Sequence, residues 1–352
     1  MATPSGVGPA RKIGKDWCLF CGKVAICARR GVETPSNIIP PGRCSPFIVV
    51  TSMSQFRVSH ISDTHLAPRL RKINENFHRV SEHIGATRPD IVINTGDLAF
   101  DAPTKRDDLA FSKTLHETLP VACRYLPGNH DIGDNPTQFG PPAEQPVTEE
   151  NRQRFVSVVG EDHWSFQAAG WWFIGLNSMV MGSGLAFEGE QFDWLASQLA
   201  AAGSKPVGLF LHKPLYPSTP DDPELAATSN RYVPQPARRH LIELLEAVDL
   251  RLIASGHIHQ RRDFTYGRVR HVWAPSTAFI VPDIRQQRVG IKEVGLVEYR
   301  FEPDGFEVNH VRAQGQIDLS SLSMSIWGTR YTRKLNALYR VRRGTPPTRD
   351  CQ

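Results

Sequence analysis

Polar residues that could bind metal ions stand where five apolar stretches of this sequence end. Most of their side chains are imidazoles and carboxylates, which bind divalent cations and transfer protons near neutral pH. In extended chain, residues i and i+2 point to the same side. The groups are Ser62-Asp63-Thr64-His65, Thr95-Gly96-Asp97, Pro127-Gly128-Asn129-His130-Asp131, Leu211-His212-Lys213-Pro214 and Ser255-Gly256-His257-Ile258-His259.

Together these groups supply more oxygen and imidazole ligands than one metal ion needs, and they contain no cysteine. Such a set suits two adjacent Mn²⁺, Fe²⁺/Fe³⁺ or Zn²⁺ ions and disfavours a closed structural zinc site. Each group alone occurs by chance in many proteins, so the weight lies in the ordered set. Gly96, Gly128 and Gly256 favour tight exits from the strands and a close approach of the backbone to whatever is bound.

The segments that must position these residues alternate between two periodicities. Strands are predicted at residues 56–61, 90–95, 121–126, 171–176, 206–211 and 250–255, and later at 270–274, 278–282 and 293–301. Helices are predicted at 70–86, 105–118, 150–159, 190–202 and 237–248. Strands that alternate with helices predict a layered α/β fold. Strand ends in such a sheet open onto a ligand crevice, so all five groups are expected there.

The ordered set of five groups resembles the calcineurin-like metallophosphoesterases over about residues 56–301. Within that family the sequence is most similar to the bacterial class III cyclic-nucleotide phosphodiesterases, through the stretches Ile61–Leu66, Gly175–Ser178 and Glu190–Leu195. The resemblance implies a four-layer αββα sandwich with two metals at the sheet edge. It also implies that one metal is held by Asp63, His65 and His259, the other by Asn129, His212 and His257, and that Asp97 bridges them.

The resemblance implies a mechanism as well. His130, beside Asn129, would face the phosphate as general acid or stabiliser of the transition state, and Asp131 would orient His130. The implied nucleophile is a hydroxide that bridges the two metals. The function implied is a metal-dependent phosphodiesterase that acts on a small substrate, such as a cyclic nucleotide or a glycerophosphodiester. The alternatives are a nuclease or a phosphomonoesterase with the same metals and, ranked lower because no ligand is missing, a non-catalytic binding scaffold.

Three further residues are candidates for lining the substrate crevice, namely Asn135, Asn177 and Tyr216. His60 alternates away from Asp63 and is interpreted as a strand residue rather than a ligand.

The net charge of +5 belongs to the two ends of the 352-residue chain. Residues 1–52 hold seven basic and two acidic residues, and residues 328–352 hold seven basic residues and one acidic residue. The remaining residues, 53–327, therefore carry a net charge of −6. An acidic core is consistent with a dense metal-ligand site and disfavours a polyanionic partner such as duplex DNA. A nucleic-acid partner is therefore kept only as part of the nuclease alternative.

Composition also divides the chain. Residues 1–52, with six Pro and six Gly, are predicted to be a poorly ordered basic extension. Met53 stands directly before the first strand, which raises the hypothesis that the natural protein begins there. A metallophosphoesterase domain is expected at 53–304 and a C-terminal extension with a basic tail at 305–352. A zinc ribbon is the alternative for the sparsely spaced cysteines of the extension, which are Cys18, Cys21, Cys27 and Cys44.

Composition excludes some classes of protein. No run approaches the roughly 18 apolar residues that a membrane-spanning helix needs. Six cysteines in 352 residues do not form a disulfide framework, so a reducing, cytoplasmic setting is expected. No pattern in the sequence indicates an oligomeric state.

Overall fold

The structure is a computed structural model. It describes the backbone of three strands, at residues 11–13, 16–21 and 24–28, and then residues 55–136, 143–223, 225 and 230–321. The chain divides into two units, residues 1–47 and 48–352, which are taken separately. The expected tail at 328–352 and the side chains of the four extension cysteines lie outside the described residues.

The first unit contains a three-stranded antiparallel sheet of order β1-β2-β3. Its strands are β1 (Arg11–Ile13), β2 (Asp16–Cys21) and β3 (Val24–Ala28). The sheet lies within the first 52 residues, where the sequence analysis expected no regular structure.

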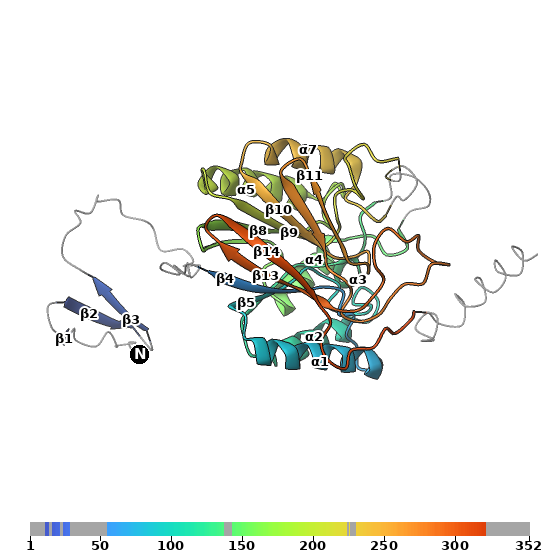
Figure 1. The fold of residues 1–352 in the computed structure, drawn as a ribbon, viewed down its shortest axis with the longest axis horizontal. Coiled ribbons are helices and arrows are strands. Elements are labelled where there is room, and N and C mark those ends of the chain that lie inside the picture. Colours follow the sequence, from blue (N-terminus) through green and yellow to red (C-terminus); the bar gives the residue numbers. More distant parts are fainter. Residues whose placement is uncertain are drawn as a thin grey trace, which may run out of the picture. The chain divides into compact units, whose positions relative to one another are not determined.

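The second unit contains two mixed sheets, which Figure 1 shows one above the other. The five-stranded sheet has the order β14-β13-β4-β5-β6 and the six-stranded sheet the order β11-β12-β10-β9-β8-β7. The first sheet consists of β4 (Phe56–Ile61), β5 (Ile91–Asn94), β6 (Cys123–Tyr125), β13 (Leu296–Glu302) and β14 (Gly305–Val311). The second consists of β7 (Trp164–Ala168), β8 (Trp171–Leu176), β9 (Val207–Leu211), β10 (Leu250–Ser255), β11 (Arg262–Tyr266) and β12 (Val269–Trp273).

Helices cover the two outer faces, with α1 and α2 below the five-stranded sheet and α5 and α7 above the six-stranded one (Figure 1). The arrangement confirms the predicted four-layer αββα sandwich. The helices are α1 (Arg71–Thr87), α2 (Arg106–His116), α3 (Asn129–Ile132), α4 (Glu149–Val158), α5 (Ala186–Ala202) and α7 (Gln235–Leu245). No helix of the described residues is both long and apolar enough to cross a membrane.

Alternation along the strands explains the layers. On β5, Val92 packs toward the helices while Ile93 packs between the sheets. On β10, Ile253 faces the helices and Leu252 faces the other sheet. Because both faces of these strands are buried, they read as continuous apolar runs, as parallel strands between helices usually do.

The observed strands differ from the predicted ones in three places. β14 pairs with β13 along its whole length, so the sheet continues past residue 304, where the sequence analysis placed a boundary. The edge strands β7 and β11 were not predicted. Residues 278–282 form a loop with one isolated bridge, Ile280 to Ser320, instead of the predicted strand.

Candidate metal centre

The predicted ligands all follow the carboxyl ends of parallel strands, and they come from both sheets. In the five-stranded sheet, β4 leads to Asp63 and His65, β5 to Asp97 and β6 to Asn129. In the six-stranded sheet, β9 leads to His212 and β10 to His257 and His259. The carboxyl ends of strands from both sheets therefore meet at one place, where α/β sheets usually bind their ligands.

The side chains converge in overlapping groups of three. In each group, one ligand atom per residue lies within 4.8 Å of the others. The groups are Asp63, His65 and His259; Asp97, His212 and His257; and, joining them, His65, Asp97 and His130.

Single distances show how close the groups of Asp63 and of Asp97 come to each other. Oδ1 of Asp63 lies 3.2 Å from Nε2 of His259, and that nitrogen lies 3.1 Å from Nε2 of His65. Asp97 faces both sides, with Oδ2 3.6 Å from Nε2 of His65 and Oδ1 3.4 Å from Nε2 of His212.

The second group is completed by an amide oxygen. Nε2 of His212 lies 3.3 Å from Oδ1 of Asn129 and 3.2 Å from Nδ1 of His257. All seven residues predicted as ligands are thus brought together.

The backbone at the ligands is unusual. Five of them adopt the left-handed conformation, with φ between 45° and 67°: Asp63, His65, Asp97, His257 and His259. Left-handed backbone is rare for residues other than glycine and is concentrated at functional sites. In the described residues, only Arg88 and Ala169 share it among the other non-glycine positions.

The three predicted glycines permit the close approach. A Cβ on Gly96 would lie 2.7 Å from Nδ1 of His212, and one on Gly256 would lie 2.7 Å from Oδ2 of Asp63. A Cβ on Gly128 would lie 2.7 Å from the carboxylate carbon of Asp97. Any larger residue would push the ligands apart.

Hydrogen bonds to backbone carbonyls fix the tautomers of three imidazoles. Since a carbonyl only accepts, the nitrogen facing it must carry the proton. Nδ1 of His259 donates to Phe279 (2.8 Å) and Nδ1 of His212 to Thr95 (2.9 Å). Nε2 of His257 donates to Asn230 (3.1 Å). In the neutral rings, the other nitrogen of each turns a lone pair toward the centre, which is how histidine is prepared to bind a metal.

The centre therefore consists almost entirely of acceptors. Oδ1 of Asp63, which faces Nε2 of His65 and of His259, is buried without a hydrogen-bond partner. Buried polar atoms of this kind are rare, because they lose hydration without replacement. Carboxylates and lone pairs pointing at one another need cations between them, so these residues fit divalent metal ions.

The pKa shifts follow the same electrostatics. Burial and the neighbouring His212 hold the pKa of His257 well below its usual value, and burial with His130 does the same for His65. Both are neutral, the form that binds metal. For His212 burial also lowers the pKa, but the Asp97 carboxylate outweighs it and raises the pKa to about 9. Without a metal, a proton on His212 supplies the positive charge that the Asp97 carboxylate favours.

The expected role of Asp131 needs correction. Its carboxylate accepts backbone N–H groups of Gly128 (2.9 Å), Leu98 (3.0 Å) and Ala99 (2.8 Å), which ties the loop of Asp97 to α3. Neighbouring residues on a helix do not face each other, so Asp131 is poorly placed to orient His130. Nδ1 of His130 is instead held by the carbonyl of Phe100 at 2.6 Å.

The three crevice candidates have structural partners. Nδ2 of Asn135 contacts the carbonyls of residues 178, 179 and 181, each at 2.8 Å. Nδ2 of Asn177 donates to Asp162 at 3.0 Å. The hydroxyl of Tyr216 bonds the buried His271 at 2.9 Å. These contacts hold loops together, and all three side chains are buried.

His60 is a strand residue, as interpreted from the sequence. It lies between the sheets, where it bonds Tyr299 (3.2 Å) and Thr95 (2.8 Å), and burial lowers its pKa to about 3.

Lys213, which directly follows His212, has a contact that the sequence did not indicate. It is buried and forms an ion pair with Asp134, in the loop after α3. Its place after a ligand was visible in the sequence, but its partner depends on how that loop folds.

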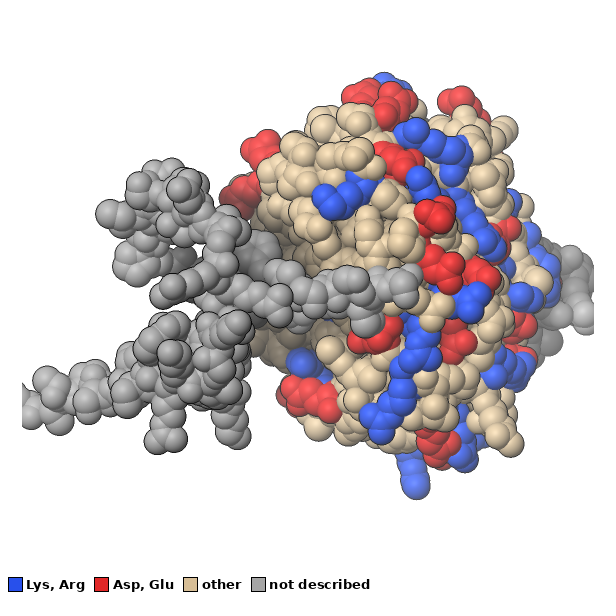
Figure 2. All heavy atoms as spheres, turned by 60° about the vertical axis from the view of Figure 1, so that its left-hand side comes forward, with Lys and Arg blue, Asp and Glu red and all other residues tan. Residues whose placement is uncertain are grey.

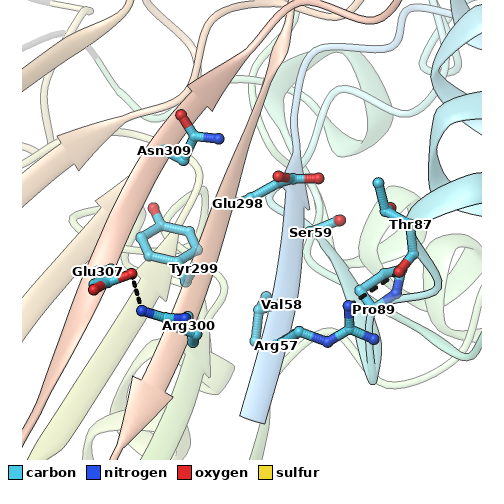
Figure 3. Close-up of a pocket in the computed structure, with 10 residues that line it drawn as sticks. All are labelled: Arg57, Val58, Ser59, Thr87, Pro89, Glu298, Tyr299, Arg300, Glu307 and Asn309. Carbon is cyan, nitrogen blue, oxygen red and sulfur yellow. Dashed lines mark hydrogen bonds and ion pairs between the residues drawn. The ribbon is translucent and has the colours of Figure 1, made fainter. Parts of the chain in front are cut away.

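A pocket of about 340 Å³ lies away from the metal centre, on the outer face of β4, β13 and β14 (Figure 3). Its charged groups bond within the protein: Arg57 donates to the carbonyl of Thr87, and Arg300 pairs with Glu307. Because these charges already have partners, nothing in the pocket points to a ligand.

Comparison with known proteins agrees with the geometry. Residues 56–261, more than half of the chain, match the family described as calcineurin-like phosphoesterase. The chain belongs to the calcineurin-like phosphoesterase family. It is accordingly a hydrolase of phosphoric esters, in a family that depends on divalent metal ions.

Curated relatives of this phosphoesterase carry two kinds of name. A 3′,5′-cyclic-nucleotide phosphodiesterase of Nostoc sp. is 25% identical over 237 residues, which cover 63% of this chain and 78% of that protein. The serine/threonine-protein phosphatase CPPED1 of Mus musculus is 27% identical over 192 residues, 51% of this chain and 56% of that protein. The chain thus spans little more than half the length of the mouse phosphatase.

Solved structures resemble the phosphoesterase in fold. A dimetal phosphatase of Danio rerio has a TM-score of 0.50 at 12% identity, covering 75% of this chain and 97% of that one. A purple acid phosphatase from yellow lupin seeds has a TM-score of 0.56 at 14% identity, covering 76% and 53%. At such identities the likeness concerns the fold alone.

Proposed function

We propose that the protein is a dinuclear metal-dependent phosphodiesterase that hydrolyses small phosphate diesters. The observation that carries the proposal is the convergence of carboxylates and imidazoles from both sheets, in which the buried Oδ1 of Asp63 has no hydrogen-bond partner and positive charge is supplied by protons on histidine. Asp63, His65 and His259 would hold one ion, and Asn129, His212 and His257 the other. Asp97 lies between the two groups and would bridge the ions.

Two bound divalent ions would supply Lewis acidity and an activated water nucleophile. The metals we propose are Mn²⁺, Fe²⁺/Fe³⁺ or Zn²⁺, because imidazole and carboxylate ligands suit all three. The chain itself would supply the proton. Nδ1 of His130 donates to the carbonyl of Phe100, and His130 lies next to Asn129 and within the group formed by His65 and Asp97. We propose that its imidazole faces the phosphate there and protonates the leaving oxygen.

A small diester is favoured by relatives that are named cyclic-nucleotide phosphodiesterases. A phosphomonoesterase is the second candidate, because the mouse relative is named a protein phosphatase. A nuclease finds less support. The core has a net charge of −6, and on the face in Figure 2 basic and acidic side chains are interspersed rather than sorted. The cytoplasmic setting stays a prediction from cysteine content.

A substrate panel tests the proposal. The full chain with Mn²⁺ is assayed on a 3′,5′-cyclic nucleotide, a glycerophosphodiester, a phosphomonoester and single-stranded DNA. We expect hydrolysis of at least one small diester, lost on chelation and restored by Mn²⁺. Hydrolysis of the monoester alone would favour the second candidate, and activity that resists chelation would contradict the metal mechanism.

The role of His130 has its own test. His130→Gln should lower kcat by about 10²–10⁴-fold, the range for a lost general acid, while Mn²⁺ binding stays unchanged. Equal losses of Mn²⁺ and activity would make His130 a ligand instead.

A further inference from the structure

Gln260 directly follows His259, and it is fully buried. Its amide makes four hydrogen bonds to one loop. Nε2 donates to Oε1 of Gln286 (2.7 Å) and to the carbonyl of Gln287 (3.0 Å). Oε1 accepts from the backbone nitrogens of Val289 and Gly290, both at 2.8 Å. A primary amide has two donors and two acceptor lone pairs, so this loop satisfies all of its bonding capacity.

The next residue reinforces the attachment of this loop, which we call the 283–291 loop after its residues. Arg261 and Ile291 exchange both backbone hydrogen bonds, at 2.8 and 2.9 Å, and Arg261 also pairs with Glu293. A Cβ on Gly290 would lie 2.5 Å from the carbonyl oxygen of Arg261. The loop is therefore held directly against the segment that carries two proposed ligands.

The contacts place this loop beside the metal centre. Just before the loop, the ring of Phe279 lies 4.7 Å from that of His259 and 5.0 Å from that of His65. Val289 packs against the buried cluster of Tyr232, Ile258 and Trp273, and Ile258 lies between the two ligands of that segment. In Figure 1 the loops after β12 extend from the end of the sandwich where α3 lies.

The loop exposes two isoleucines beside the charged side chains of Asp283 and Arg288. Ile284 and Ile291 are 52% and 50% exposed, two of the four large apolar side chains that stand exposed in the described residues. A single exposed isoleucine is ordinary. Here two exposed isoleucines lie on one loop, which a buried amide holds beside the proposed phosphate site. Substrate pockets commonly combine such apolar side chains with a few polar groups.

We infer that the 283–291 loop contacts the organic group esterified to the phosphate, and that Gln260 is the positioning residue that holds the loop there. The inference rests on the proposed function. The metal ligands and His130 would address only the phosphate, which all diesters share. Discrimination between diesters must then come from surface next to the centre, and this loop supplies it.

Kinetics on two diesters test the contact. The substrates are 3′,5′-cyclic AMP, with a large organic group, and dimethyl phosphate, in which both ester groups are methyl. In Ile284→Ser we expect the KM for cyclic AMP to rise about fivefold from lost apolar contact, with kcat and the KM of the methyl diester unchanged. Gln260→Leu should shift the same KM further. Ile317→Ser, at an equally exposed isoleucine (49%) held by Asn76 of α1, is the matched control and should change neither.

A second measurement follows the loop without any catalysis. Arg288 is 57% exposed, so trypsin can cut there once the loop opens. Gln260→Leu loses four hydrogen bonds and should accelerate cleavage after Arg288 by at least about tenfold, while Ile317→Ser cleaves like the wild type. Unchanged cleavage in Gln260→Leu would overturn the positioning role.

The outcomes separate the two proposals. If the wild type with Mn²⁺ hydrolyses neither diester, the proposed function fails and the inference with it. If the wild type is active and Ile284→Ser leaves the KM for cyclic AMP unchanged, or raises both KM values equally, the inference alone fails. Ile284 is exposed, so its variant decides the matter even if Gln260→Leu does not fold.

Discussion

Five proposed metal ligands have an energetically unfavourable backbone conformation, although their side chains are suited to binding metal ions. A non-glycine residue in the left-handed region costs about 1–3 kcal/mol, and five proposed ligands are found there. Asp and His tolerate this conformation better than β-branched residues do. The sequence showed which residue types cluster, but not this backbone state, because φ depends on how each loop closes after its strand.

Asp97 offers the sharpest test at this scale. In Asp97→Asn, the amide loses the negative charge and introduces N–H donors into a centre made of acceptors. We expect affinity for Mn²⁺ to fall by at least about 100-fold and diester hydrolysis to fall with it. Metal titration and rate assays measure both.

The control for this variant is Asp108→Asn, at an equally buried aspartate of α2 that pairs with Arg69. It should bind Mn²⁺ like the wild type. An Asp97→Asn protein with full metal content and full rate would contradict the assignment.

Asp131 marks the limit of residue-level reasoning. Its position next to His130 suggested a carboxylate that orients an imidazole, yet it binds three backbone N–H groups. A buried carboxylate binds whatever donors the fold brings to it, and these come from residues 33 and 32 positions earlier in the chain as well as from Gly128. Local sequence does not contain that information.

At the scale of elements, buried strands and amphipathic helices were predictable, whereas the edge strands β7, β11 and β14 were not. The predicted helix at 70–86 is α1 (Arg71–Thr87), and the predicted strand at 250–255 is β10 (Leu250–Ser255). β11 and β14 were missed because one face of each is open, so charged residues interrupt their apolar pattern. The run at 278–282 is apolar because Ala278 and Phe279 pack in the core, although they pair with no strand.

The turn before α3 gives a prediction at this scale. Gly128→Ala would place a Cβ against Asp97, so we expect a loss of about 1–3 kcal/mol in the free energy of unfolding and weaker Mn²⁺ binding. Gly189→Ala, inside α5 with no atom within 4 Å of the new Cβ, should instead gain roughly 0.5–1 kcal/mol. Denaturant unfolding with and without Mn²⁺ compares them. A tolerated alanine at 128 would show that the loop of Asp97 can move.

For the whole molecule, the proposed chemistry occupies the acidic middle of the chain. Every proposed ligand lies between residues 63 and 259, and the basic ends account for the positive net charge. This division supports the proposal that residues 53–304 form the catalytic domain, extended by β14 at its edge.

Truncation tests that division. A chain that starts at Met53 should keep the kcat, KM and Mn²⁺ content of the full chain, because it retains all ligands and the whole of β4. Steady-state kinetics and metal analysis of the two proteins make the comparison. A large fall in activity would assign residues 1–52 a part in the site.

The origin of the ligands in two different sheets has a consequence for folding kinetics. His65 and His259 face each other at 3.1 Å across 194 residues of sequence. A loop that long closes late, so the complete ligand set forms only once the sheets have packed. An ion that needs both halves cannot guide the early steps of folding. Mn²⁺ should therefore slow unfolding in stopped-flow experiments and leave the refolding rate nearly unchanged. The bound metal would then stabilise the folded protein without accelerating its folding.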